Sequence, residues 1–370
     1  MRKLAVLILG LVYFASGATA FAADMTQLVA DVGSSQGRTV ESAFKQLQAM
    51  GAEGEPVVPA IVRMLKAKKT YAEQDYGLDN VVYPMAFQTL KAIGTHSDDV
   101  LQVAMDYYKN SADYLNAKPF ALDVITGFGD RAAAAVPELA AALDDSKKTA
   151  DRWRIIAALQ EIGPAAAPAK STLIKIATSS TNSDERGRVL AALAKIAPHD
   201  QAVLTAYAEV ASRKPGNSGD IDTIRAFDAY VTQYSAFNAD DLAVLASYMN
   251  RVTNRDEAMP NHAGHIMAAD PAYLDVAKVF LNYPENAALI MPSLAARLRQ
   301  LDLHTKDFRA TLELAGEFGA HAAPLADPIY VRAASREQIT AGWFQPEAID
   351  TLKKIGTPEA VEKSEMLLKR

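Results

Sequence analysis

Residues 155–177 read IIAALQEIGPAAAPAKSTLIKIA, and this stretch decides the fold. Its first half carries large apolar residues at positions i, i+1, i+4 and i+7, which is the spacing of one helix face. These residues are Ile155, Ile156, Leu159 and Ile162. Gly163 follows, which can adopt a positive φ, and Pro164 lacks the N–H that would continue the helix. The spacing therefore predicts a helix that ends at residue 162.

The second half of the stretch predicts another helix. Leu173, Ile174 and Ile176 form a second apolar stripe, and Pro168 is tolerated in a first helical turn. The whole stretch is interpreted as a helix end, a tight turn and a second helix.

This unit recurs along the chain. Similar turns, mostly 34 to 37 residues apart, are expected at Gly51, Gly94, Gly129, Gly163, Ala197, Gly319 and Gly356. Two less regular turns, near Tyr234 and Tyr283, fill the long interval after Ala197. A period of this length with two helices per repeat is typical of an α-solenoid. The sequence thus predicts an all-α superhelix of about nine antiparallel helix pairs, with 24–370 as one domain.

The first 23 residues are predicted to be a cleaved signal peptide. Arg2 and Lys3 precede an apolar run over 4–14, and small residues follow, with cleavage expected after Ala20, Ala22 or Ala23. No later stretch is apolar enough to cross a bilayer. We therefore expect the mature chain to lie in the periplasm and to have no transmembrane segment.

The bulk composition excludes several classes of function. The chain has no cysteine, so it has no disulfide, thiol nucleophile or thiolate metal site. Its net charge is −6 without a basic stripe, which argues against a nucleic-acid partner. No phosphate-binding loop, serine nucleophile elbow or zinc-protease helix occurs. These features predict a protein that is not an enzyme and that needs no cofactor.

Two stretches resemble the HEAT-repeat family, in particular the short repeats of bacterial HEAT-like and PBS-lyase-type proteins. They are VPELAAALDDSKKTADRWRIIAALQEIG at 136–163 and STLIKIATSSTNSDERGRVLAALAKIA at 171–197. The resemblance implies that the acidic turn residues and the arginines after them link adjacent repeats by hydrogen bonds. These arginines are Arg152, Arg154, Arg186 and Arg188. The alternative is a ladder of anion-binding arginines along one edge.

Two insertions interrupt the period, and we expect function where the pattern is interrupted. The first, 66–80, offers Tyr71, Asp75 and Tyr76 as contact residues. Each insertion separates the first helix of its repeat from the second, so both are expected to emerge at the same edge.

The second insertion, 253–269, contains Arg255 as a candidate binding residue and the pair His262 and His265. Two histidines three positions apart can supply two imidazole ligands to a metal, although two ligands do not complete a site.

The expected function is that of a periplasmic scaffold that binds another protein or an extended peptide on one face of the solenoid. Two alternatives stay open at this point. One is a metal-dependent or ligand-binding module built around 253–269, and the other is a binder of carbohydrate or cell wall.

Overall fold

The structure is a computed structural model. It describes residues 24–68, 79–110, 116–145, 149–213, 218–234, 236–257, 272–301, 305–335 and 344–369. Within these ranges the chain is all-α and forms eighteen α-helices, α2 to α19, and six 3-10 segments, η1 to η6. Helices α2 to α19 follow one another as nine consecutive pairs, which confirms the predicted all-α, solenoid-like fold. Residues 24–32 form a further helix before α2.

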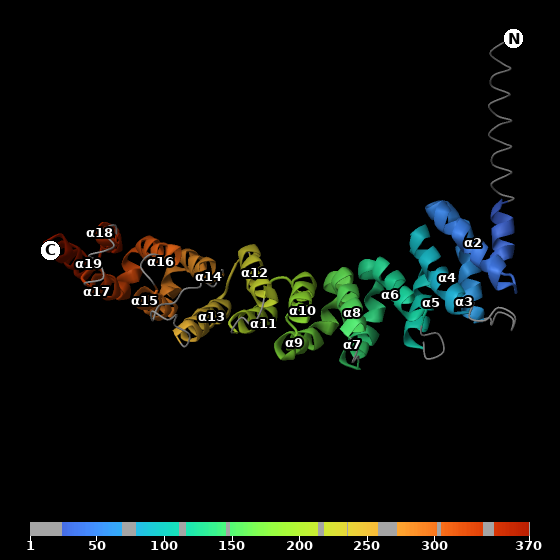
Figure 1. Ribbon diagram of the computed structural model, residues 1–370, viewed down its shortest axis with the longest axis horizontal. Coiled ribbons are helices and arrows are strands. Elements are labelled where there is room, and N and C mark those ends of the chain that lie inside the picture. Colours follow the sequence, from blue (N-terminus) through green and yellow to red (C-terminus); the bar gives the residue numbers. More distant parts are fainter. Residues whose placement is uncertain are drawn as a thin grey trace, which may run out of the picture. The chain divides into compact units, whose positions relative to one another are not determined.

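The chain divides into two compact units, with unit 1 ending at Thr172 and unit 2 beginning at Leu173. The elements of unit 1 are α2 (Gly37–Met50), η1 (Gly51–Val57), α3 (Val58–Ala67), α4 (Asp79–Ile93), α5 (Asp98–Lys109), α6 (Lys118–Gly127), η2 (Gly129–Ala135), α7 (Val136–Asp145), α8 (Thr149–Ile162) and η3 (Gly163–Ala169). The even-numbered helices α2, α4, α6 and α8 pack side by side in chain order, and α3 packs on α5 (Figure 1).

Unit 2 repeats this arrangement. Its elements are the greater part of α9 (Lys170–Ser179), then α10 (Ser183–Ile196), α11 (Gln201–Ala211), α12 (Ser218–Gln233), α13 (Ala239–Glu257), α14 (Tyr273–Val279), η4 (Phe280–Asn282), η5 (Pro284–Leu289), α15 (Met291–Gln300), α16 (Lys306–Glu317), η6 (Gly319–Leu325), α17 (Ala326–Ala333), α18 (Phe344–Ile355) and α19 (Pro358–Leu368). The even-numbered helices α10 to α18 form one row, and the odd-numbered helices α11 to α19 form a second row.

The predicted helix faces form the core. All four apolar residues of the predicted α8 stripe, from Ile155 to Ile162, are at most 3% exposed. In α9, Leu173 and Ile176 are buried, whereas Ile174 is half-buried. Each helix therefore buries one stripe against its neighbours, as expected for a solenoid-like array.

Glycines end six of the even-numbered helices as predicted. Positive φ values occur at Gly51, Gly94, Gly129, Gly163, Gly319 and Gly356. The prediction of a tight turn after Gly163 is wrong, however, because the connection is the seven-residue 3-10 segment η3, and Pro168 lies in this segment instead of in α9. A 3-10 helix repeats every three residues, so Ala166 and Ala169 face the same side, and both are buried. Proline and alanine suit this segment because proline needs no donor and alanine fits close to neighbouring helices.

The remaining turns of unit 2 are closed by aromatic rings. Ala197 has a φ of −139°, and the positive φ of this turn falls on His199 instead. The His199 ring lies against the Tyr234 ring, with 4.8 Å between centroids, and Tyr234 stacks on Phe237 at 4.7 Å. The backbone N–H of Phe237 donates to the Tyr283 hydroxyl at 2.9 Å. Ring packing between successive turns therefore replaces the glycine turn, and this explains why the repeat pattern is weak there.

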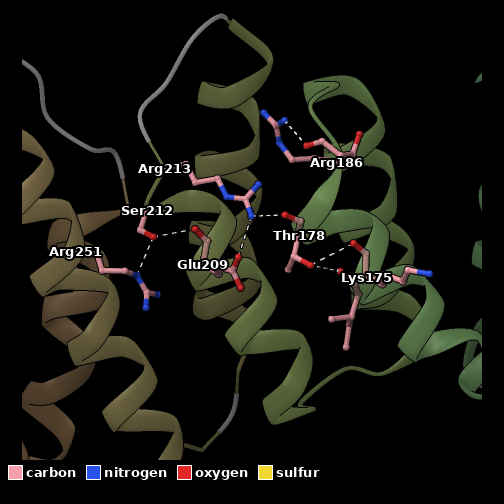
Figure 2. A network of polar contacts seen from close by, with 9 residues as sticks. Lys175, Thr178, Arg186, Glu209, Ser212, Arg213 and Arg251 are labelled. Carbon is pink, nitrogen blue, oxygen red and sulfur yellow. Dashed lines mark hydrogen bonds and ion pairs between the residues drawn. The ribbon is translucent and has the colours of Figure 1, made fainter.

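Side chains of odd-numbered helices bond to the carboxyl-terminal end of the preceding odd-numbered helix. Three of these side chains donate to a backbone carbonyl: Tyr107 Oη to Leu65 O at 3.0 Å, Arg332 Nη2 to Leu301 O at 2.9 Å, and Arg213 Nη2 to Thr178 O. Figure 2 shows the Arg213 contact at the ends of α9 and α11. The last carbonyls of a helix lie outside its regular hydrogen-bond pattern, and these side chains supply donors to them. Leu65 O also accepts the backbone N–H of Lys68 at 3.3 Å.

Candidate functional site

A surface groove in unit 1 is the candidate functional site. It lies where the carboxyl-terminal half of α5 faces η2 and the first turn of α7, and it has a volume of about 350 Å³. Its apolar lining consists of Met105, Ile125, Ala134, Ala135 and Pro137. Its polar lining consists of Gln102, Asp106, Tyr108, Lys109 and Glu138.

The groove follows from two different connections between successive helices. The short turn before α5 begins at Gly94, and α5 starts at Asp98, whereas the seven residues of η2 precede α7. The last residues of η2, Ala134 and Ala135, are small and leave space opposite Met105. The groove is therefore formed by regular repeat elements, and not by an insertion.

Tyr108 supplies a hydrogen-bond donor at one wall. Its side chain is only 4% exposed, and the Lys118 ammonium lies 4.7 Å from the centre of its ring. Burial, together with the nearby carboxylates of Asp151 and Glu138, raises the pKa of Tyr108 to about 12. The phenol is consequently protonated at neutral pH and can donate a hydrogen bond to a ligand.

The rim of the groove carries ion pairs that solvent screens. Lys109 Nζ lies 3.5 Å from Glu138 Oε2, and Lys68 Nζ lies 3.2 Å from Asp106 Oδ2. All four side chains are at least 40% exposed. Exposed pairs of this kind contribute only about 0–1 kcal/mol, so a ligand can displace them at little cost.

The residues predicted from the two insertions lie outside the described part of the chain. Tyr71, Asp75 and Tyr76 fall between α3 and α4, and His262 and His265 fall between α13 and α14. Arg255 belongs to α13, but its side chain is also outside the described residues. These predictions therefore stay predictions. Among the residues that the structure describes, no group of three or more His, Asp or Glu side chains could hold a metal ion.

Arg186, one of the arginines predicted to link adjacent repeats, forms a hydrogen bond within its own repeat. Arg186 Nη1 donates to Ser180 O at 3.0 Å, and the Ser180 hydroxyl donates to Glu185 Oε2 at 2.6 Å. These bonds hold the turn before α10, and the link between repeats stays a prediction. The bond from Arg213 to the end of α9 was not predicted, although a basic residue at the end of a helix is a sequence signal for such a cap (Figure 2).

Comparison with known proteins gives little further guidance. No family model matches the chain, and no curated protein matches it. Among solved structures, the crystal structure of an engineered protein from the Northeast Structural Genomics Consortium is similar, with a TM-score of 0.45 and 14% sequence identity over 94% of this chain and 98% of that chain.

None of the described helices combines the length and the apolar character needed to span a membrane.

Proposed function

We propose that the chain is a non-enzymatic scaffold of the periplasm that holds a segment of another protein in the groove between α5 and α7. The observation that supports this proposal is the combination of an apolar floor with hydrogen-bonding groups at the walls. Ile125 forms part of the floor and is fully buried, while Gln102 at the rim is exposed.

An extended peptide matches this combination. It carries side chains on alternating sides and backbone N–H and C=O groups that need partners. Its apolar side chains fit between Met105 and Pro137, while the Gln102 amide and the Tyr108 hydroxyl can bond its backbone. Pockets for small molecules range from about 300 to 1,000 Å³, so a groove of about 350 Å³ suits a few side chains better than a large cofactor.

The chemistry of the groove also favours binding over catalysis. A general base works best when its pKa lies near the operating pH. The buried titratable group here is Tyr108, and its pKa of about 12 is far from neutrality.

Two substitutions in η2 form a matched test. Ala133 and Ala134 are both exposed, but only Ala134 lines the groove. We expect Ala134→Trp to fill the groove and to weaken binding of peptides, selected from a random library on the intact chain, by at least tenfold. Ala133→Trp should leave their affinity within twofold, and circular dichroism should show the same helicity for both variants.

Photo-crosslinking extends this test to natural partners. A benzophenone amino acid at position 134 should capture defined envelope proteins that position 133 does not capture. Peptides that bind the wild type and both tryptophan variants equally would contradict the proposal, as would identical crosslinks from the two positions.

A further inference from the structure

Arg251 of α13 is held in a fixed orientation by two hydroxyl groups. Its Nε donates to Ser212 Oγ at 2.9 Å, and its Nη1 donates to Ser247 Oγ at 3.0 Å. The Ser212 hydroxyl in turn donates to the backbone carbonyl of Glu209 at 2.9 Å. Figure 2 shows the contact from Arg251 to Ser212 and the contact from Ser212 to Glu209 at the end of α11. The guanidinium therefore does not have to be ordered when a ligand arrives.

Among the described residues, the charges around Arg251 leave one positive charge in excess. The described carboxylate that acts electrostatically on Arg251 is that of Glu209, and it is already paired with Arg213 Nη2 at 2.9 Å. Within the described residues, no carboxylate lies within ion-pair distance of Arg251. Two guanidinium groups thus share one carboxylate, in a chain whose net charge is −6.

Arg251 also keeps donors for a ligand. A guanidinium has five N–H donors, and the two serines accept two of them. The Arg251 and Ser247 side chains are both exposed, so an external group can reach them. Partial burial lowers the pKa of Arg251, and the Glu209 charge acts in the opposite direction. Because the guanidinium is partly removed from water, an anion bound to it is attracted more strongly than at a fully hydrated arginine.

We propose that Arg251, supported by Ser212 and Ser247, is a binding site for a carboxylate group. A carboxylate presents two oxygens in a plane, which matches the planar fork of a guanidinium. The site lies in unit 2 and does not depend on the groove of unit 1.

The carboxylate can come from a free organic acid or from an acidic peptide, and two probes distinguish these sources. Sodium acetate and hexaglutamate are titrated into the intact, ¹⁵N-labelled chain at constant ionic strength, and the arginine Nε–H signals are recorded by NMR. The Arg251 signal is the one that disappears in Arg251→Gln. We expect it to shift saturably with both probes. A peptide source predicts at least tenfold tighter binding of hexaglutamate, and a free-acid source predicts equal affinity per carboxylate.

Three variants test the roles of the residues. Hexaglutamate binding, followed by calorimetry, should weaken at least tenfold in Arg251→Gln and severalfold in Ser247→Ala, which keeps the charge but removes one support. Arg225→Gln is the control, because Arg225 is exposed and already paired with Asp222 at 3.1 Å. It should change the affinity by less than twofold.

Three results would overturn the proposal. The first is an equal loss of affinity in Arg225→Gln and Arg251→Gln, which would indicate non-specific charge attraction. The second is wild-type affinity in Arg251→Lys, which keeps the charge without the fork. The third is tighter binding of inorganic phosphate than of acetate at the Arg251 signal.

Discussion

The same substitution, glycine to alanine, should have opposite effects at two positions in unit 1. Gly127 is the last residue of α6, and Gly129 begins η2 with a φ of +56°. At both positions a new Cβ would meet no heavy atom within 4 Å. Steric crowding is therefore the same, and only the backbone conformation differs.

The magnitudes follow from that conformation. At position 127 alanine should stabilise the helix, because glycine in a helix costs roughly 0.5–1 kcal/mol relative to alanine. At position 129 the left-handed conformation costs alanine about 1–2 kcal/mol, partly offset by about 0.4–1 kcal/mol from the less flexible unfolded chain. We expect Gly127→Ala and Gly129→Ala to differ in free energy of unfolding by about 1.5 kcal/mol.

Urea titration measures this difference through the fluorescence of Trp153, which lies in α8 of unit 1. The experiment is done in a Trp343→Phe background, so that Trp153 is the only tryptophan of the chain. Gly129→Asn is the control, because asparagine tolerates positive φ better than alanine and should recover much of the loss. If Gly129→Ala is as stable as Gly127→Ala, the positive φ of the turn is not what requires glycine.

Three further outcomes are expected. Arg213→Met should lower the stability of unit 2 by about 1.5–3 kcal/mol, because it removes the charged donor that bonds to the end of α9. Arg225→Met is the control with an exposed ion pair, and it should change the stability by no more than about 0.5 kcal/mol. Urea titration measures both variants. Gly54→Val should cost about 1–3 kcal/mol in the same assay, because even a Cβ at position 54 would lie 3.2 Å from the side chains of Leu47 and Ile93. Burial raises the pKa of Tyr108 to about 12, so the folded state keeps this phenol neutral between pH 10 and 12, whereas the unfolded state ionises near pH 10. The contribution of Tyr108 to the free energy of unfolding is therefore complete below pH 10 and is lost as the pH rises to about 12. Denaturation across this range and ultraviolet titration, each done with wild type and Tyr108→Phe, would detect this loss.

Local patterns predicted the helices and the positions of the turns between them. The helix faces follow from apolar spacing, since residues three and four positions apart share one side of a helix. The glycine turns follow from the rarity of positive φ in other residues. The pattern also placed turns at Ala197, near Tyr234 and near Tyr283, where helical segments end. The ring contacts that close these turns could not be predicted this way, because rings such as Tyr234 and Phe237 contact residues from other turns.

The groove could not be predicted from the sequence either. It depends on the offset between α5 and α7, which arises because one connection is short and the next is a 3-10 segment. The lining residues Met105 and Ala134 belong to the regular pattern and carry no local sign of a site. Arg251 was missed for a related reason, because the serines that orient it lie in α13 and after the end of α11.

The three side-chain bonds that join successive odd-numbered helices, from Tyr107, Arg213 and Arg332, have the same polarity. In each of these three bonds the donor comes from the later repeat and the acceptor from the earlier one, as with Tyr107 and Leu65. Shortening the array from its carboxyl terminus would therefore remove a side-chain donor from a backbone carbonyl at the new end. Shortening it from the amino terminus would only release a side chain to water. Truncations from the two ends should thus lower the stability unequally. Removing repeats from the amino terminus should cost less stability than removing them from the carboxyl terminus.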